Sequence, residues 1–524
     1  MTARERPLRW TASVLSLALL AITLYTYFVS RHRILWSDEL FAWTLLTDPS
    51  FHHMLSSWRA GADSGGIGFY LLGRVWIDLF GKSDMAFSAF SAIDCFIAFA
   101  FAWLTLRRIY RQEFVLAILF VTWFGSDTIL WQMIQARFYG MLLAGVAFVL
   151  FTTVRSTDEL FTHSDQRNST LFLNFAANVL LVSAHPLGIV YSAIILCGTA
   201  MSDLLHHRRR LFLYATSVLS WTAIWFSREN MQSTANVGKP HFWTTTPHPI
   251  DLLKMYQPDA VSYILYPVLL FLLITLLWPS RRHRLFHDFL ERSQVLIPGM
   301  ILTAAPVALW ILSQRGTSLF VDRYLIPFTL GVAILGLEAL TQLFPSGLSD
   351  ARLWARLGCA ALLAFLLFCS AKESIQDYPK TALVPPFDFT ETLAAQIPSG
   401  LPVVFERPDI FHIMLFQQPT MRSVYLLDWE TAIDPASPRG MVPGFHEMAT
   451  WKKVGYYSNS ILDSQDFLSK ADDFIVVQDQ QALWFDHRIL NNPDWETRKL
   501  AIYKNSIWSG TIWRVHKKSM SSVM

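Results

Sequence analysis

Long apolar segments recur through the first 371 residues of this chain of 524 residues. Many of them hold about 20 residues with few charges, which is the length that an α-helix needs to cross the hydrocarbon core of a bilayer. Charged residues make up 16% of the sequence, below the roughly 25% that is typical of soluble domains. Because a bilayer offers no water to satisfy backbone groups, such segments fold as helices. The sequence therefore predicts an α-helical polytopic membrane protein.

The apolar runs predict about eleven transmembrane helices. Arg4, Arg6 and Arg9 precede the first run, which lacks a convincing cleavage site, so an uncleaved first helix is expected. Pro186 lies in nearly continuous apolar sequence that is too long for one span, and it is expected to separate two helices. The expected spans are 10–29, 84–106, 113–127, 138–154, 170–184, 186–205, 211–227, 262–279, 294–313, 324–343 and 354–371, with an aromatic-rich segment at 67–80 partly in the interface.

Four arginine clusters between these segments predict the orientation of the chain. With a cytoplasmic N-terminus and a break at Pro186, every cluster falls on the cytoplasmic side, as the positive-inside rule requires. The sequence therefore predicts an inner or plasma membrane protein with a cytoplasmic N-terminus. The net charge is only +3, and the basic residues are scattered between the apolar segments, which speaks against nucleic-acid binding. The clusters are Arg107 with Arg108 and Arg111, Arg208 with Arg209 and Arg210, Arg281 with Arg282, Arg284 and Arg292, and Arg352 with Arg356.

From residue 372 onward the apolar runs give way to short, β-prone segments. About 150 residues are enough for one hydrophobic core. We therefore expect two domains, a transmembrane domain over 1–371 and an extracytoplasmic soluble α/β domain over 372–524. The four cysteines lie in apolar runs and predict no disulfide. The expected strands lie at 402–406, 423–427, 474–477 and 511–515.

Chemically reactive side chains gather on one side of the membrane in this topology. The dipeptide Asp38-Glu39 follows the first helix on the outer face, whereas the identical Asp158-Glu159 falls in the cytoplasm and is set aside. Loop 228–261 also falls on the outer face. The candidate site residues on the outer face are Asp38, Glu39, Arg137, Tyr139, His185, Arg323 and Tyr324.

Each candidate also has a structural explanation. Asp38 and Glu39 are compatible with a solvated loop. Arg137 and Arg323 are compatible with arginines that extend to lipid headgroups, which is the commoner role of a single interfacial arginine. His185, which precedes a proline, is compatible with a helix-end residue. The functional interpretation therefore rests on the set and on the membrane face that its members share.

Such a set suits the transfer of a sugar from a lipid phosphate. A carboxylate deprotonates the attacking hydroxyl and supports the electron-poor sugar carbon. An arginine holds the phosphate through a bidentate fork while the phosphate takes on leaving-group charge. Helix ends near the interface allow a lipid-linked donor to enter from the side.

The order of these motifs resembles the GT-C superfamily, specifically the branch of protein O-mannosyltransferases, aminoarabinose transferases and bacterial polyprenyl-phosphate-sugar transferases. The resemblance covers residues 10–371. The segments that carry it are Trp36-Ser37-Asp38-Glu39, Gly68-Phe69-Tyr70-Leu71-Leu72, Leu79-Phe80-Gly81, Ala136-Arg137-Phe138-Tyr139-Gly140-Met141-Leu142, Ala184-His185-Pro186 and Asp322-Arg323-Tyr324-Leu325-Ile326-Pro327.

The resemblance implies an inverting glycosyltransferase on the non-cytoplasmic face. Its donor would be a dolichyl- or undecaprenyl-phosphate monosaccharide, and its acceptor an envelope glycan, lipid or protein. No cofactor is firmly implied, and a divalent metal stays open. Carried over to this chain, the resemblance makes Asp38 the base and Glu39 a neighbouring carboxylate, places His185 near the site, and gives the donor site to Arg137, Tyr139, Arg323 and Tyr324.

One segment departs from the family, and other function classes stay open. Many members carry His-Pro-Pro where this chain has Ser64-Gly65-Gly66-Ile67-Gly68. A polyprenyl-linked lipid transporter or flippase would be expected to show inverted repeats, and none is visible. A non-catalytic envelope assembly protein is a third class. An oligosaccharyltransferase would carry a Trp-Trp-Asp-type acceptor motif, to which Leu427-Asp428-Trp429-Glu430 is the nearest approach.

Overall fold

The computed structural model of the chain divides into two compact units. We call Met1–Val29, Gly65–Ser227 and Thr246–Ile375 the membrane unit, and Ser30–Ser64, Arg228–Thr245 and Gln376–Met524 the α/β unit. The α/β unit thus includes two segments, 30–64 and 228–245, that lie within the transmembrane domain expected over 1–371. The structure describes residues 8–31, 33–162, 167–235, 246–256, 279–314, 320–345, 388–434, 441–479, 484–505 and 508–518.

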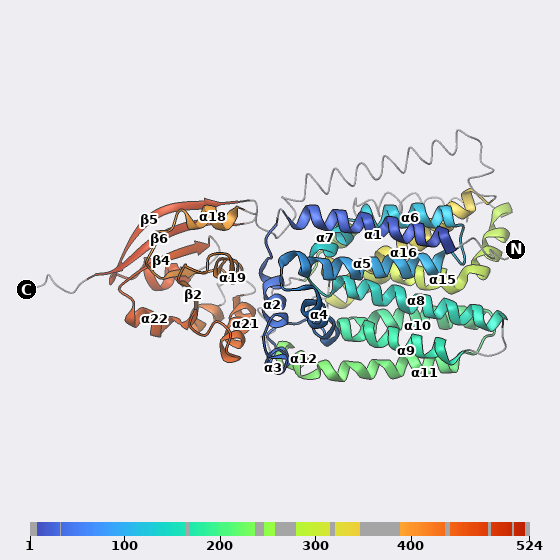
Figure 1. Ribbon diagram of the computed structural model, residues 1–524, viewed down its shortest axis with the longest axis horizontal. Coiled ribbons are helices and arrows are strands. Elements are labelled where there is room, and N and C mark those ends of the chain that lie inside the picture. The colour runs from blue at the N-terminus through green and yellow to red at the C-terminus, as the bar shows by residue number, and fades with distance from the viewer. Residues whose placement is uncertain are drawn as a thin grey trace, which may run out of the picture. The chain divides into compact units, whose positions relative to one another are not determined.

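Helices make up the described part of the membrane unit (Figure 1). Apolar side chains dominate these helices, and their shared core is buried between α5 and α8, α8 and α9, α10 and α15, and α15 and α16. The helices are α1 (Leu8–Ser30), α4 (Ile67–Phe80), α5 (Asp84–Leu106), α6 (Gln112–Phe124), α7 (Asp127–Ile134), α8 (Tyr139–Thr162), α9 (Asn168–Ala184), α10 (Gly188–Leu205), α11 (Leu211–Ser220), α13 (Pro249–Met255), α15 (Pro279–Ser313) and α16 (Phe328–Leu343).

Several of these helices are long and apolar enough to cross a membrane, and the chain is an integral membrane protein. Among the described residues there are five such helices, or six if α6 and α7 form one bent span. Helices α9 and α16 are apolar but shorter. Of the eleven expected spans, 354–371 and all but the last residue of 262–279 lie outside the described residues, so the count of eleven stays a prediction.

The breaks between helices follow the local sequence. Helix α9 ends at Ala184, and α10 begins at Gly188, so the expected break at Pro186 is confirmed. Proline has no N–H to donate and restricts the residue before it, which is why His185 is extended, with φ −162° and ψ 148°. The run expected at 113–127 forms α6, and the chain bends by 67° where α7 follows it. The caps explain the bend, because α6 ends at Phe124 with Gly125 as its C-cap, and the Ser126 hydroxyl accepts the Ile129 N–H to start α7.

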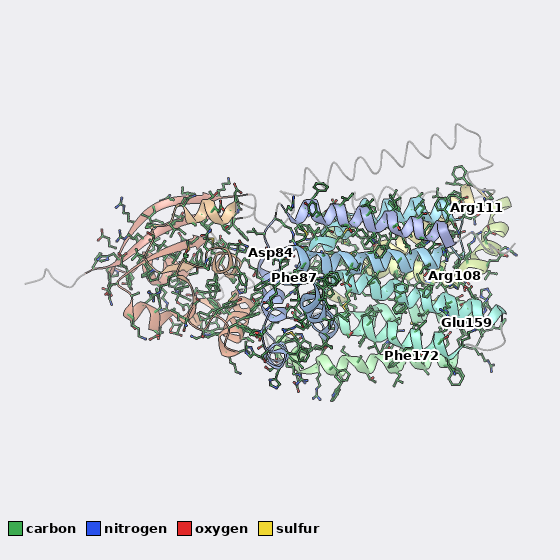
Figure 2. All side chains as sticks on the ribbon, viewed as in Figure 1. Asp84, Phe87, Arg108, Arg111, Glu159 and Phe172 are labelled. Atoms are coloured by element: carbon green, nitrogen blue, oxygen red, sulfur yellow. The ribbon has the colours of Figure 1, made fainter. Side chains whose placement is uncertain are left out.

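The two ends of the membrane unit differ in their side chains. Asp84 and Phe87 mark one end, where α5 begins, and Arg108, Arg111 and Glu159 mark the opposite end (Figure 2). At that opposite end Arg108 donates to Asp158 at 2.7 Å, and Thr170 donates to Glu159 at 2.6 Å. The acidic pair that was set aside is thus held in local ion pairs and hydrogen bonds at the arginine-rich end.

A six-stranded sheet forms the centre of the α/β unit, with strand order β3-β2-β1-β4-β6-β5 (Figure 1). The first four strands of this order are parallel, and β4, β6 and β5 pair antiparallel. All four expected strands are present, and two further strands were not expected from the sequence. The strands are β1 (Val403–Phe405), β2 (Ser423–Leu427), β3 (Ile461–Asp463), β4 (Asp473–Asp479), β5 (Trp495–Lys504) and β6 (Ser509–Lys517).

Helices accompany these strands, and three of them come from distant parts of the chain. Helices α2 and α3 follow the first membrane helix in sequence, and α12 follows α11. Helix α2 packs on α19, α3 packs on α12, and α19 packs on β1 and β2. The helices of the α/β unit are α2 (Ser37–Leu46), α3 (Phe51–Arg59), α12 (Arg228–Ala235), α18 (Phe389–Ala394), α19 (Pro408–Gln417), α20 (Trp429–Ile433), α21 (Met441–Lys453) and α22 (Ser464–Lys470).

Candidate functional site

Five of the seven predicted site residues come together in the membrane unit. They lie at three chain reversals, between α7 and α8, between α9 and α10, and just before α16. Arg137 occupies the first reversal, where its N–H donates to the carbonyl of Gln135 at 2.7 Å. The Ser91 hydroxyl of α5 donates to the Arg137 carbonyl at 3.1 Å and holds this reversal against the bundle. The side chains of Arg137 and Tyr139 are buried.

His185 lies in the second reversal and stacks on the first. Its ring lies parallel to that of Phe138, with centroids 4.7 Å apart and an interplanar angle of 14°. The ring of His185 also contacts the ring of Tyr324, and the two centroids are 5.1 Å apart. The Leu187 N–H donates to His185 Nδ1 at 3.2 Å. Because Nδ1 accepts this bond, the neutral ring carries its proton on Nε2.

Arg323 and Tyr324 bring the third reversal to the same place. The guanidinium carbon of Arg323 lies 5.7 Å from the centroid of the Tyr139 ring, within cation–π range. The rings of Tyr139 and Tyr324 are 5.9 Å apart. From α10, the Tyr191 hydroxyl donates to the Tyr324 carbonyl at 2.7 Å, which ties the third reversal to the second.

Electrostatics keep the histidine of this group neutral. Burial and the nearby positive charges of Arg137 and Arg323 lower the pKa of His185 to about 3. At any pH near neutrality the ring is therefore uncharged and offers one N–H donor, at Nε2. Two guanidinium groups and one neutral N–H make an arrangement that can bind an anion such as a phosphate.

The glycine-rich segment 64–68 brings a fourth stretch of backbone next to His185. The Gly66 N–H donates to the Ala184 carbonyl at 3.2 Å, just before His185. A Cβ at Gly66 would lie 2.2 Å from the Ser183 carbonyl oxygen, and one at Gly68 would lie 2.4 Å from the Ser183 hydroxyl. Neither a side chain nor a proline fits at position 66, because proline also lacks the donated N–H.

The other two predicted residues, Asp38 and Glu39, belong to the α/β unit and differ from each other. Both lie in the first turn of α2, where the helix dipole favours a negative charge. Glu39 is fully buried, and both of its oxygens accept from Arg33 at 2.7 Å. Glu39 Oε2 also accepts the Trp36 N–H at 3.2 Å and so caps the helix. Asp38 is half-buried.

Arg33 is not among the site residues expected from the sequence. It is buried and holds Glu39 in a planar, bidentate ion pair, which rigidly orients the start of α2. A signal was present, because Arg33 is one of two arginines in the short polar stretch between the first helix and the acid pair. Side chains meet on a helix when they are three or four residues apart. Arg33 and Glu39 are six residues apart, so their spacing does not predict the contact that the folded chain shows.

Two other acids and one possible metal group lie outside this arrangement. Glu338 accepts from Arg292 at 2.8 Å and from the Tyr110 hydroxyl at 3.2 Å, as befits a structural residue. Asp94 is buried on α5 and lies beside Gly140. Within the described part of the chain, one group brings three metal-ligating atoms together, and it includes none of the seven predicted residues. That group is His287, Asp288 and Glu291 on α15, with two of its three members exposed.

By sequence, no family model and no curated protein matches this chain. By structure, the chain is similar to ArnT from Cupriavidus metallidurans bound to undecaprenyl phosphate, with a TM-score of 0.52, 12% identity, and coverage of 95% of this chain and 97% of that one. The apo state of ArnT gives the same TM-score over 96% and 98%. The apo oligosaccharyltransferase of Archaeoglobus fulgidus gives a TM-score of 0.50 at 12% identity, over 90% and 69%. The chain has the GT-C fold, which confirms the predicted fold class.

Proposed function

We propose that this chain is an inverting membrane glycosyltransferase that moves a monosaccharide from a polyprenyl-phosphate donor to an acceptor of the cell envelope. The observation that carries the proposal is the convergence of Arg137, Arg323 and the neutral His185 on one place in the membrane unit. Such a group supplies two planar cationic forks and one N–H donor to a phosphate. The GT-C fold supports the reaction class, and the undecaprenyl phosphate bound to ArnT supports the kind of donor.

In the proposed reaction, Asp38 accepts the proton of the attacking hydroxyl. The hydroxyl oxygen forms a bond to the anomeric carbon from the face opposite the phosphate. The bond from that carbon to the phosphate oxygen breaks, and its electron pair stays on the oxygen. Arg137 and Arg323 stabilise the charge that develops there, and a single displacement inverts the anomeric centre. Glu39 holds the start of α2 through Arg33 instead of reacting.

The proposal includes the orientation that the arginine clusters predict. The N-terminus lies in the cytoplasm, the α/β unit lies outside the inner or plasma membrane, and the acceptor is an envelope glycan, lipid or protein. A pair of reporters fused after Met524, one active only in the cytoplasm and one only outside it, measures this directly. We expect activity of the external reporter alone. Activity of the cytoplasmic reporter would overturn the orientation.

The reaction is tested with the purified full chain in lipid nanodiscs and an undecaprenyl-phosphate hexose. We expect release of free undecaprenyl phosphate, slowly by hydrolysis and faster with an envelope extract. Arg137→Ala and Arg323→Ala should each raise the KM for the donor, and lysine should restore it only partly, because it lacks the planar fork. Asp158→Asn is the matched control, since this acid is ion-paired to Arg108 at the arginine-rich end of the membrane unit. Adding a chelator to the same assay decides whether a divalent metal takes part.

A flippase would give a different result in the same materials. It would move the intact donor across a vesicle membrane and would need no cleavage of the bond between sugar and phosphate. Transbilayer movement of uncleaved donor, without release of undecaprenyl phosphate in the presence of envelope extract, would refute the transferase. The roles given to Asp38, Arg137 and Arg323 would then fall with it.

A further inference from the structure

The proposed base lies on a helix that packs with the C-terminal segment of the chain, residues 376–524. Helix α2 follows the first membrane helix in sequence, yet residues 30–64 group with residues 376–524 in one compact unit. Within that unit α2 packs on α19. The C-terminal segment, which had no role in the proposed reaction, is therefore in direct contact with the helix that carries Asp38.

An aromatic cluster makes the first connection between the two. Phe41 of α2 lies edge-on against His412 of α19, with ring centroids 4.2 Å apart, and stacks on Trp451 of α21 at 5.1 Å. All three side chains are buried. Next to them, Trp43 of α2 meets Phe416 of α19 edge-on at 4.8 Å. We call Phe41, His412 and Trp451 the aromatic clamp.

The clamp includes a histidine that ordinary packing does not explain. His412 is fully buried, and neither of its ring nitrogens has a hydrogen-bond partner among the described residues. Burying an unsatisfied imidazole lowers stability compared with an apolar side chain of similar shape. The ring contacts that compensate this cost come from Phe41, Trp451 and, at 5.4 Å, Tyr457.

A row of polar contacts makes the second connection. The hydroxyl groups of Thr44, on α2, and Tyr457 lie 2.5 Å apart. Tyr457 has a φ of 53°, a left-handed conformation that costs energy for a residue other than glycine and persists only where surrounding contacts hold it. Just beyond α2, the Tyr456 hydroxyl donates to Asp48. His53 of α3 links the same two chain segments, because its ring contacts Asp48 at 2.6 Å and the Val454 carbonyl at 2.7 Å.

We propose that the C-terminal part of the α/β unit is the positioning platform for Asp38, and that the aromatic clamp and the Thr44–Tyr457 contact fasten α2 to it. This inference rests on the proposed function, because it takes Asp38 as the base. The Arg33–Glu39 ion pair fixes the first turn of α2, and the clamp fixes its middle. Reactions of positioned groups are sensitive to displacements of about 1 Å, which can cost roughly 100-fold in rate. None of the fastening residues touches the reacting atoms in this scheme.

The test combines hydrogen exchange with kinetics in the full chain. Thr44→Val and Tyr457→Phe remove the hydroxyl contact with little change in volume, and His412→Ala opens the clamp. We expect each to speed amide exchange in residues 38–46 and to lower kcat about tenfold or more, with the KM for undecaprenyl-phosphate hexose unchanged. The Thr44→Val/Tyr457→Phe double variant should lose no more than either single variant. His412→Phe, which keeps an aromatic ring, should restore both readouts.

Phe474→Leu is the matched control. Phe474 is fully buried on β4 and packs on Phe467 and Trp495, so its truncation weakens the same unit without touching the clamp. We expect it to leave exchange in 38–46 and kcat unchanged at temperatures where the unit stays folded. Equal losses of kcat and of exchange protection in Phe474→Leu and His412→Ala would mean that the clamp only stabilises the fold, and this would overturn the proposal.

Two further outcomes separate this inference from the function on which it rests. If Asp38→Asn abolishes transfer while the clamp and hydroxyl variants keep full kcat, the platform is refuted and the transferase stands. If Asp38→Asn has no effect on transfer, the assignment of the base fails first, and positioning of Asp38 fails with it. Unchanged exchange in residues 38–46 in all three fastening variants refutes the platform whatever the activity.

Discussion

Replacing His412 with phenylalanine should remove a large acid sensitivity from the α/β unit. The His412 side chain is fully buried among the rings of Phe41, Trp451 and Tyr457, and burial lowers its pKa from 6.5 to about 3. The folded unit therefore holds the neutral imidazole, whereas the unfolded chain takes up a proton near pH 6.5. The stability that the neutral ring permits is fully present above pH 6.5 and is lost as the pH falls from 6.5 toward 3.

The size of the effect follows from the two pKa values. At pH 5 the unfolded chain gains the free energy of protonating His412 over about 1.5 pH units, which amounts to about 2 kcal/mol. His53 acts in the opposite direction, because its contacts with the Val454 carbonyl and Asp48 raise its pKa. Its contribution is present below pH 6.5 and is lost as the pH rises through the raised value. A comparison of the wild type with His412→Phe cancels the His53 contribution.

The measurement is hydrogen exchange of the β1 and β4 amides in the full chain between pH 5 and pH 8. After correction for the intrinsic exchange rate, the protection free energy of His412→Phe should gain about 2 kcal/mol on the wild type as the pH falls across this range. A constant offset between the two proteins reports only the different fit of the phenyl ring. A difference that does not change with pH would refute the reasoning, because it would mean that His412 takes up its proton as readily in the folded unit as in the unfolded chain.

Three further predictions follow from the contacts around the site. Asp38→Asn should lower transfer roughly 10²- to 10⁴-fold in the undecaprenyl phosphate release assay without loss of folded protein, and near-normal turnover would exclude it as the base. Glu39→Gln should destabilise the α/β unit by about 3–5 kcal/mol, because it leaves Arg33 buried without its carboxylate, and the Arg33→Met/Glu39→Leu double variant should recover most of that loss in hydrogen exchange. Gly66→Ala should lower the free energy of unfolding by about 1–3 kcal/mol, because its Cβ would overlap the Ser183 carbonyl. A thermal unfolding midpoint equal to that of the wild type would contradict this.

The sequence was enough to place the three chain reversals at one end of a helical bundle. Counting apolar segments and breaking the run at Pro186 put Arg137, His185 and Arg323 at helix ends of the same side, and the structure brings these three and their tyrosines together. Sequence spacing carries no information on ring stacking, so the parallel contact between Phe138 and His185 was not foreseen.

In the α/β unit, residue patterns predict some strands and fail to predict others. Strands β1, β2, β4 and β6 carry runs of β-branched and aromatic residues, and all four were predicted. Strand β5, with the sequence WETRKLAIYK, lies at the edge of the sheet, and four of its ten residues are charged, so its pattern is that of an exposed segment. Strand β3 is only three residues long, which is too short for any periodicity.

The acid pair illustrates a limit of another kind. Asp38 and Glu39 are adjacent in sequence and chemically alike, yet Glu39 is fully buried against Arg33 while Asp38 is half-buried. Successive residues of a helix point about 100° apart, so which of the two turns inward depends on what packs against the helix. The packing partners of α2 come from α19 and α21, some 370 or more residues later.

The sequence by itself determined that this is a polytopic helical membrane protein, where most helices break, and that an α/β segment follows. These properties depend on local features, because the length of an apolar run decides whether it can span a bilayer and the missing N–H of proline interrupts a helix. Only the tertiary structure decided that residues 30–64 fold with residues 376–524, that Glu39 is paired with the buried Arg33, and that His412 is buried against the helix of Asp38. Those facts depend on contacts between residues far apart in the chain, for which local hydrophobicity and spacing leave no trace.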